Sequence, residues 1–208
     1  NDNDNSLQKT TEKNVNKKIV DPEYIKGYDK IVLEKNRWGF LPQSVQKLLN
    51  TDNRDCVLQS NKLKSNHKCI LRKGVENDEN RSFIACFADI YSNYYKLKKE
   101  DKLSIDFMID KIIEIMTLDK FMSYFNGNLI QIFNNDDINN IDDDKIEKYK
   151  NEKNKNDEFK HKIFKKNEFQ NEKSLNFIKK VINSYENFID YLKNKDSVID
   201  HVYLWDMV

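Results

Sequence analysis

An apolar stripe near the C-terminal end constrains the fold more than any other feature of this sequence. Apolar residues recur there every three or four positions, the spacing that gathers side chains on one face of an α-helix. Two further stretches repeat this spacing, one behind Asn80 or Ser82 and one behind Ser104, and these residue types cap helix N-termini. The chain is therefore expected to be mainly α, or α+β if one or two short strands form. The stripe consists of Leu175, Ile178, Val181, Ile182, Tyr185, Ile189 and Leu192.

Two short apolar runs are the candidate strands. Residues 30–33 follow the turn residue Gly27, and residues 69–71, which form either a strand or the start of a helix, are closed by Gly74. Between the two runs, Pro42 stands where the first turn of a helix tolerates proline. The sequence thus predicts a short helix between a candidate strand and a run that is either a strand or the start of a helix.

Composition divides the chain into four expected segments. Residues 1–18 are rich in Asn, Lys and Thr with little to bury, which is typical of a disordered leader. Residues 19–133 are expected to form a helical core domain. Residues 134–170 turn acidic and then Lys/Asn-rich, which indicates an insertion that is partly disordered or a solvated helix. Residues 171–208 are expected to be helices that complete the core or start a next domain.

Neither catalysis nor membrane insertion finds a signal in the sequence. The four glycines are isolated from one another, so neither phosphate-binding loop pattern occurs and nucleotide hydrolysis is not expected. No apolar run approaches the roughly 18 residues that span a bilayer. His67, His161 and His201 lack the context of an activated nucleophile. The acidic clusters 136–137 and 142–144 lack the spacing of a calcium loop, which favours solvated loops. The chain is expected not to be an enzyme and to need no cofactor.

The cysteines allow two interpretations. An odd number of cysteines without a secretory signal favours reduced thiols in an intracellular compartment. A structural zinc site is the alternative, although no CxxC knuckle holds two ligands on one turn, and Cys86 falls on the apolar face of an expected helix. The zinc-ligand residue types are Cys56, His67, Cys69 and Cys86.

Positive charge is concentrated between residues 35 and 75. Nine basic residues lie there against the two acids Asp52 and Asp55, a local balance of +7 in a chain whose net charge is only +1. Such a stretch, interleaved with Trp38 and Phe40, is typical of a surface that neutralises phosphates, although a solvated Lys-rich loop has the same composition. The residues expected to face phosphate are Arg37, Lys47, Arg54, Arg72, Lys73 and Arg81.

Five phrases in one order resemble a known family. They are residues 37–47 (RWGFLPQSVQK), 69–76 (CILRKGVE), 82–86 (SFIAC), 126–129 (NGNL) and 203–206 (YLWD). Together they resemble the large subunit of the poxvirus-type early transcription factor of nucleocytoplasmic large DNA viruses. The resemblance covers residues 37 to 133 and the last few residues.

The resemblance implies a subunit that binds double-stranded promoter DNA and recruits the viral RNA polymerase. It also implies a smaller partner of the helicase/ATPase type, and a location in the virion and in the cytoplasmic viral factory. The chain would be an internal fragment of a longer polypeptide, since it starts without Met and ends on apolar residues. The alternative is a protein–protein scaffold in a large viral assembly, in which the apolar faces of residues 105–116 and 175–192 would contact a partner.

Overall fold

The computed structural model describes residues 23–65, 68–98, 103–135, 141–153, 158, 160–165 and 172–207. Contacts divide the chain into two compact units. Unit 1 comprises Asn1–Leu33 and Arg37–Lys73, and unit 2 comprises Glu34–Asn36 and Gly74–Val208. The expected leader lies outside the described residues. The division after Lys73 falls inside the segment 19–133 that was expected to be one core domain.

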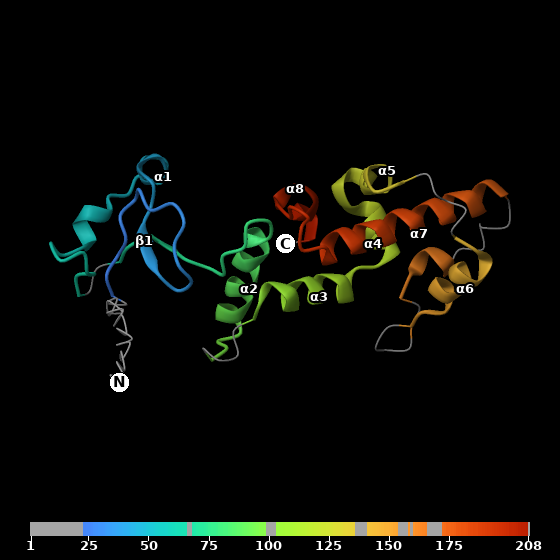
Figure 1. Cartoon of the computed structure of the whole chain (residues 1–208), viewed down its shortest axis with the longest axis horizontal. Helices are drawn as coiled ribbons and strands as arrows, with labels where there is room; N and C mark the ends of the chain where they lie inside the picture. The colour runs from blue at the N-terminus through green and yellow to red at the C-terminus, as the bar shows by residue number, and fades with distance from the viewer. Residues whose placement is uncertain are drawn as a thin grey trace, which may run out of the picture. The chain divides into compact units, whose positions relative to one another are not determined.

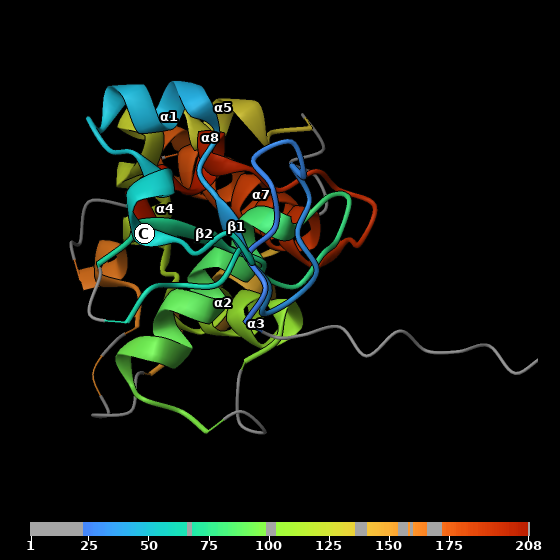
Figure 2. The ribbon, with the colours of Figure 1, turned by 90° about the vertical axis from the view of Figure 1, so that its left-hand side faces the viewer.

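Unit 1 contains a two-stranded antiparallel sheet and two short helices (Figure 1). Its elements in chain order are β1 (Trp38–Phe40), α1 (Gln43–Leu48), the 3₁₀ helix η1 (Asn53–Cys56) and β2 (Leu71–Lys73). Figure 2 shows β1 and β2 side by side. In their antiparallel register Trp38 lies opposite Lys73. The helix after Pro42 is confirmed. The run 69–71 was expected to be either a strand or the start of a helix, and its last residue, Leu71, begins the strand β2.

The other expected strand, at residues 30–33, is wrong. Ile31 and Val32 are 81% and 69% exposed, and only Leu33 of this run is buried. Leu33 packs against the backbone of Gly39, where an added Cβ would lie 2.9 Å from a Leu33 methyl. The run therefore contributes one anchor to a small core instead of a paired strand, and glycine is needed on β1 for that close approach.

Unit 2 is helical in the residues described. Its elements are α2 (Ser82–Tyr94), α3 (Ile105–Ile115), α4 (Leu118–Ser123), η3 (Tyr124–Gly127), α5 (Leu129–Ile132), α6 (Asp143–Asn151), η5 (Lys162–Lys165), α7 (Glu172–Lys193), α8 (His201–Leu204) and η6 (Trp205–Met207). The expectation of a mainly α chain with short strands is confirmed.

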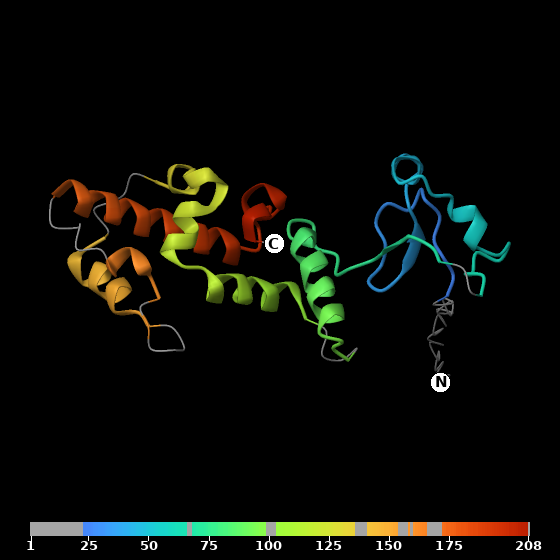
Figure 3. The same ribbon diagram turned by 180° about the vertical axis from the view of Figure 1, so that it is seen from behind.

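The long helix α7 organises unit 2. It lies beside α4, α5 and α6 in Figure 1 and, from behind, in Figure 3, and it also contacts α3. Most of its predicted apolar stripe is buried in the core, including Ile182 and Leu192, which have no exposed surface. The predicted stripe of α3 is buried as well, and Ser104 caps this helix by accepting a hydrogen bond from the Phe107 N–H. The periodicity thus identified the core faces correctly.

Helix α2 has a narrower buried face than its sequence suggests. Ile84, Ala85 and Ala88 are buried, whereas Ile90 and Tyr94, which the helical spacing places on the predicted apolar face, are 61% and 78% exposed. The C-terminal half of α2 therefore presents apolar side chains to solvent.

Part of the expected insertion belongs to the core. Asp142 caps α6 by accepting a hydrogen bond from the Lys145 N–H, and Ile141 just before it is 2% exposed. Cluster 142–144 is thus the start of a helix, where negative charge is favoured, while cluster 136–137 lies outside the described residues. Among the described helices, none combines the length and the apolar character that a bilayer crossing requires.

His161, which composition placed in the insertion, is buried within unit 2. Its Nδ1 accepts a hydrogen bond from the Leu118 N–H at 3.1 Å, and its Nε2 lies 3.2 Å from a Glu152 carboxylate oxygen. The ring is therefore the neutral tautomer that donates from Nε2. Burial is the main cause that lowers the pKa of His161, because the charged imidazolium would lose its hydration.

Acidification is expected to destabilise unit 2 through His161. The unfolded chain protonates this histidine near its ordinary pKa of 6.5, while the folded chain does so only at lower pH. The free energy of unfolding should therefore be unaffected by His161 above that pH. Below it, the free energy should fall by up to about 1.4 kcal/mol per pH unit until the folded-state pKa is reached. Urea unfolding across this window should show a shallower pH dependence in His161→Gln, whose amide does not titrate. Equal slopes in the two proteins would assign the effect to other groups.

Candidate nucleic-acid interface

The six residues expected to face phosphate do not all belong to one unit. Arg37, Lys47, Arg54, Arg72 and Lys73 lie in unit 1, whereas Arg81 lies in unit 2. Each of the four arginines has a hydrogen-bond partner within its own unit. How available each one is to a phosphate therefore depends on that partner.

Arg81 is committed to the interior of unit 2. It is 6% exposed, and its guanidinium donates to Asp106 at 2.9 Å and to Asp78 at 3.0 Å. The hydrogen bond from Arg81 is the first cause that lowers the pKa of Asp78, so this carboxylate stays ionised. Arg81 therefore ties the start of α2 to α3, and its two carboxylate partners would repel a phosphate.

Arg72 holds the backbone of unit 1 together. From β2 its Nε donates to the Phe40 carbonyl at 2.7 Å, its Nη1 to Ile31 at 3.0 Å, and its Nη2 to Lys30 at 2.9 Å and Gly27 at 3.4 Å. A guanidinium presents several donors in one plane, which suits it to collect carbonyls from separate segments. Arg72 consequently fastens residues 27–31 to β1, and most of its donors are occupied.

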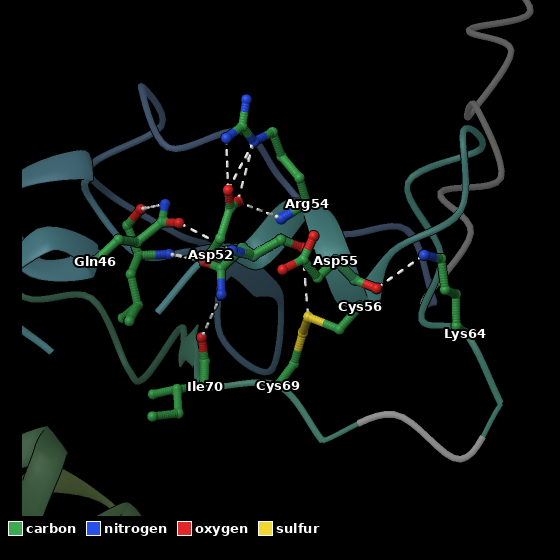
Figure 4. The surroundings of a disulfide bond; sticks show 10 residues. Gln46, Asp52, Arg54, Asp55, Cys56, Lys64, Cys69 and Ile70 are labelled. Atoms are coloured by element: carbon green, nitrogen blue, oxygen red, sulfur yellow. Dashed lines mark hydrogen bonds and ion pairs between the residues drawn. A yellow bond between two sulfur atoms is a disulfide. The ribbon is translucent and has the colours of Figure 1, made fainter. Parts of the chain in front are cut away.

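Arg54 is exposed but neutralised by a neighbour. Its Nε lies 3.0 Å from both carboxylate oxygens of Asp52, and its Nη2 lies 2.5 Å from one of them (Figure 4). Asp52 also caps η1 by accepting a hydrogen bond from the Arg54 N–H. The side-chain hydrogen bond from Arg54 is the main cause that lowers the pKa of Asp52 to about 2. At neutral pH, Asp52 therefore cancels the charge of Arg54.

The remaining three residues differ in how available they are. Arg37 is half-buried and donates to the Tyr24 carbonyl at 3.1 Å. Lys73 is half-buried on β2. Lys47 is exposed in the last turn of α1, and its ammonium group makes no hydrogen bond or ion pair with a described residue. Lys47 is thus the most available of the six predicted cations.

Lys47 and Arg54 line the same cleft of unit 1, which has a volume of about 650 Å³. No pattern in the sequence indicates this cleft, because the residues around it come from separate segments. Its wall combines aromatic, amide, aliphatic and charged side chains. They are Tyr28, Phe40, Gln43, Gln46, Lys47, Thr51, Asp52, Asn53, Arg54, Val57, Leu58, Gln59 and Asn61.

The buried amide of Asn53 fixes one wall of this cleft. Its Oδ1 accepts from the Leu41 N–H and its Nδ2 donates to the Ile70 carbonyl, both at 3.0 Å. Gln46 completes the arrangement, accepting from the Asn53 N–H at 3.0 Å and donating to the Leu41 carbonyl at 2.8 Å. Because Asn53 is 4% exposed and both atoms of its amide are hydrogen-bonded, it holds η1 against the segments that lead into α1 and β2.

A disulfide between Cys56 and Cys69 links the last residue of η1 to the segment that leads into β2 (Figure 4). The expectation of three reduced thiols is therefore wrong for these two residues, because the fold brings together cysteines that lie 13 positions apart in sequence. Cys86 is a free thiol on α2 of unit 2, and His67 lies outside the described residues. Among the residues that the structure describes, no group of three or more His, Cys, Asp and Glu side chains is placed to hold a metal ion.

Charge separates along the boundary between the units. Unit 1 has 14 Lys and Arg against 8 Asp and Glu, a balance of +6. Unit 2 has 22 against 27, a balance of −5, and the two balances sum to the net +1 of the whole chain. The near-neutral total thus conceals a basic unit and an acidic one.

Comparison with protein-family models, with curated proteins and with solved structures finds no match to this chain.

Proposed function

We propose that this chain is a non-catalytic, DNA-binding fragment of a viral early transcription initiation factor, and that unit 1 makes the DNA contact. The single observation that carries the proposal is the +6 balance of unit 1 beside the −5 balance of unit 2. Lys and Arg side chains bind nucleic acid by displacing the counterions condensed on its phosphates, so the basic unit is the one that gains from contact.

The resemblance to the early transcription factor supports this assignment. Two of its phrases, residues 37–47 and 69–76, contain β1 and β2, which pair with each other in unit 1. In the proposed assembly the helicase/ATPase-type subunit and the RNA polymerase are the protein partners. Recognition of the promoter then belongs to the complex as a whole, with unit 1 contributing phosphate contacts.

The scaffold alternative was based on the apolar faces of residues 105–116 and 175–192, and these faces are largely buried. The apolar stripes of α3 and α7 fill the core of unit 2, so they are not available to a partner. Exposed apolar residues, such as Ile90 and Tyr94 on α2, still favour a protein contact. DNA binding is the stronger proposal because the positive charge is a property of the whole of unit 1, whereas the protein contact would rest on a few exposed side chains.

Replacing Asp52 by Asn is expected to strengthen DNA binding and to make it more salt-dependent. Asn caps a helix about as well as Asp, so η1 should persist, but the amide no longer cancels the charge of Arg54. One additional phosphate contact steepens the slope of log K against log salt by about 0.9. The measurement is fluorescence anisotropy of the whole chain with a short labelled duplex between about 50 and 200 mM salt.

Asp55→Asn is the matched control, because Asp55 lies on the same 3₁₀ helix and its loss changes the net charge equally. Its carboxylate makes no hydrogen bond with Arg54 in the structure. The control should therefore leave the salt slope near that of the unmodified chain. Absent or salt-independent binding by the unmodified chain would overturn the proposed DNA contact, and equal effects of the two variants would remove Arg54 from it.

A further inference from the structure

The cleft of unit 1 carries more chemistry than backbone neutralisation needs. Besides Lys47 and Arg54, its lining includes the aromatic rings of Tyr28 and Phe40. Tyr28 is 51% exposed, so much of its ring surface is open to a ligand. The volume of about 650 Å³ falls within the range typical of small-molecule sites. Aromatic faces beside cations are the combination on which unpaired bases stack.

Two amide side chains of the lining are unused within the unit. The side-chain amides of Gln46 and Asn53 form hydrogen bonds with backbone groups, as described above. The side-chain amides of Gln43 and Gln59, by contrast, form no hydrogen bond with any described residue, and both residues are exposed. A glutamine amide presents a donor and an acceptor together, which matches the edge of a nucleobase.

The charges of the cleft select an anionic ligand. Asp52 is the one acid among its lining residues, and Arg54 neutralises it, whereas Lys47 has no described partner. A ligand that carries both an aromatic ring and a negative charge therefore fits better than a neutral peptide side chain, which would leave Lys47 uncompensated.

We propose that this cleft binds a single nucleotide, with the base against Tyr28 and Phe40 and the phosphate at Lys47. Gln43 and Gln59 are the groups placed to hydrogen-bond the base edge. The proposal rests on the proposed function when the nucleotide belongs to a DNA strand, in which case it must be unpaired, because a paired base has no free face or Watson–Crick edge. A free nucleoside monophosphate carries the same chemistry.

The test compares four probes with the whole chain at one salt concentration. They are a paired duplex, the same duplex with one unpaired adenosine, the corresponding single strand and free adenosine monophosphate as competitor. Stacking of one base is worth about 1–3 kcal/mol, so the bulged duplex and the single strand should bind roughly tenfold more tightly than the paired duplex. Tyr28→Leu should abolish this preference and leave the affinity for the paired duplex unchanged, whereas Tyr28→Phe, which keeps the ring, should retain it.

Each outcome decides between the two proposals. Salt-dependent binding of the paired duplex without a preference for the unpaired base would overturn the nucleotide site and leave the proposed function standing. A preference that survives Tyr28→Leu unchanged would also overturn the assignment of the site to this cleft. Saturable binding of adenosine monophosphate that Tyr28→Leu abolishes, without binding of any strand, would support the cleft as a free-nucleotide site and overturn the DNA proposal. No binding of any probe would overturn both.

Discussion

Arg72→Lys is expected to lower the free energy of unfolding of unit 1 by roughly 3 kcal/mol, although it preserves the charge. Hydrogen bonds from charged donors contribute about 1.5–3 kcal/mol each and do not add fully when they share one side chain. The guanidinium of Arg72 reaches four carbonyls, on Gly27, Lys30, Ile31 and Phe40. An ammonium is a compact point charge and cannot span them.

The measurement uses the distribution of tryptophan in this chain. Trp38 lies on β1 of unit 1 and Trp205 in unit 2, and these are the only two tryptophans in the sequence. Trp205 is 70% exposed, so Trp205→Phe leaves Trp38 as the reporter of unit 1 at little cost to the fold. Urea unfolding followed at Trp38 should shift to much lower concentration in Arg72→Lys.

Two further variants distinguish the hydrogen bonds of the Arg72 guanidinium from its positive charge. Arg72→Met should destabilise unit 1 to a similar or larger extent, because it removes the same hydrogen bonds. Lys68→Met removes an exposed cation that has no hydrogen bond or ion pair with a described residue, so it should change stability by no more than about 0.5 kcal/mol. If Arg72→Lys changed the free energy of unfolding as little as Lys68→Met, the hydrogen bonds of Arg72 would not stabilise unit 1. Arg72 would then again be available to a phosphate.

The sequence predicted those parts of the fold whose determinants are local. The periodicity of α3 and α7 identified their buried faces, and Ser104 caps α3 as its residue type suggested. These features need only the neighbouring turns of the same helix. Ile31 and Val32 show the limit of this reasoning, because an apolar composition favours a strand only when a partner strand is present.

The candidate interface was less predictable because its charges are decided by partners. The carbonyl groups that bind Arg72 lie 32 to 45 positions away in sequence. One of the two carboxylate partners of Arg81, Asp106, lies 25 positions away. Arg54 and Arg81 each had one local signal, since Asp52 precedes Arg54 by two residues and Asp78 precedes Arg81 by three. Counting basic residues therefore located the basic unit but not which of its cations are available.

Removing the disulfide is expected to destabilise unit 1 by roughly 3 kcal/mol and to leave unit 2 unchanged. The cross-link joins residues 13 positions apart, and closing a loop of this length restricts the unfolded chain by about that amount. Unit 1 depends on this bond because its core is small, with Ile25, Leu33 and Leu41 as its buried aliphatic residues among those described. Both the double variant Cys56→Ser with Cys69→Ser and treatment with a reductant should lower the urea midpoint at Trp38.

The free thiol of Cys86 provides the control for this experiment. Cys86→Ser lies on α2 of unit 2, so it should not move the Trp38 transition or change its response to reductant. In a Trp38→Phe background, Trp205 should report a unit 2 transition that is the same with and without reductant. Because Arg54 lies on η1 and Asp52 caps it, loss of the disulfide should also weaken DNA binding under conditions where unit 1 becomes partly unfolded. A Trp38 transition that ignores reductant would show that Cys56 and Cys69 are reduced in the protein, and the stability of unit 1 would then rest on the Arg72 and Asn53 hydrogen bonds alone.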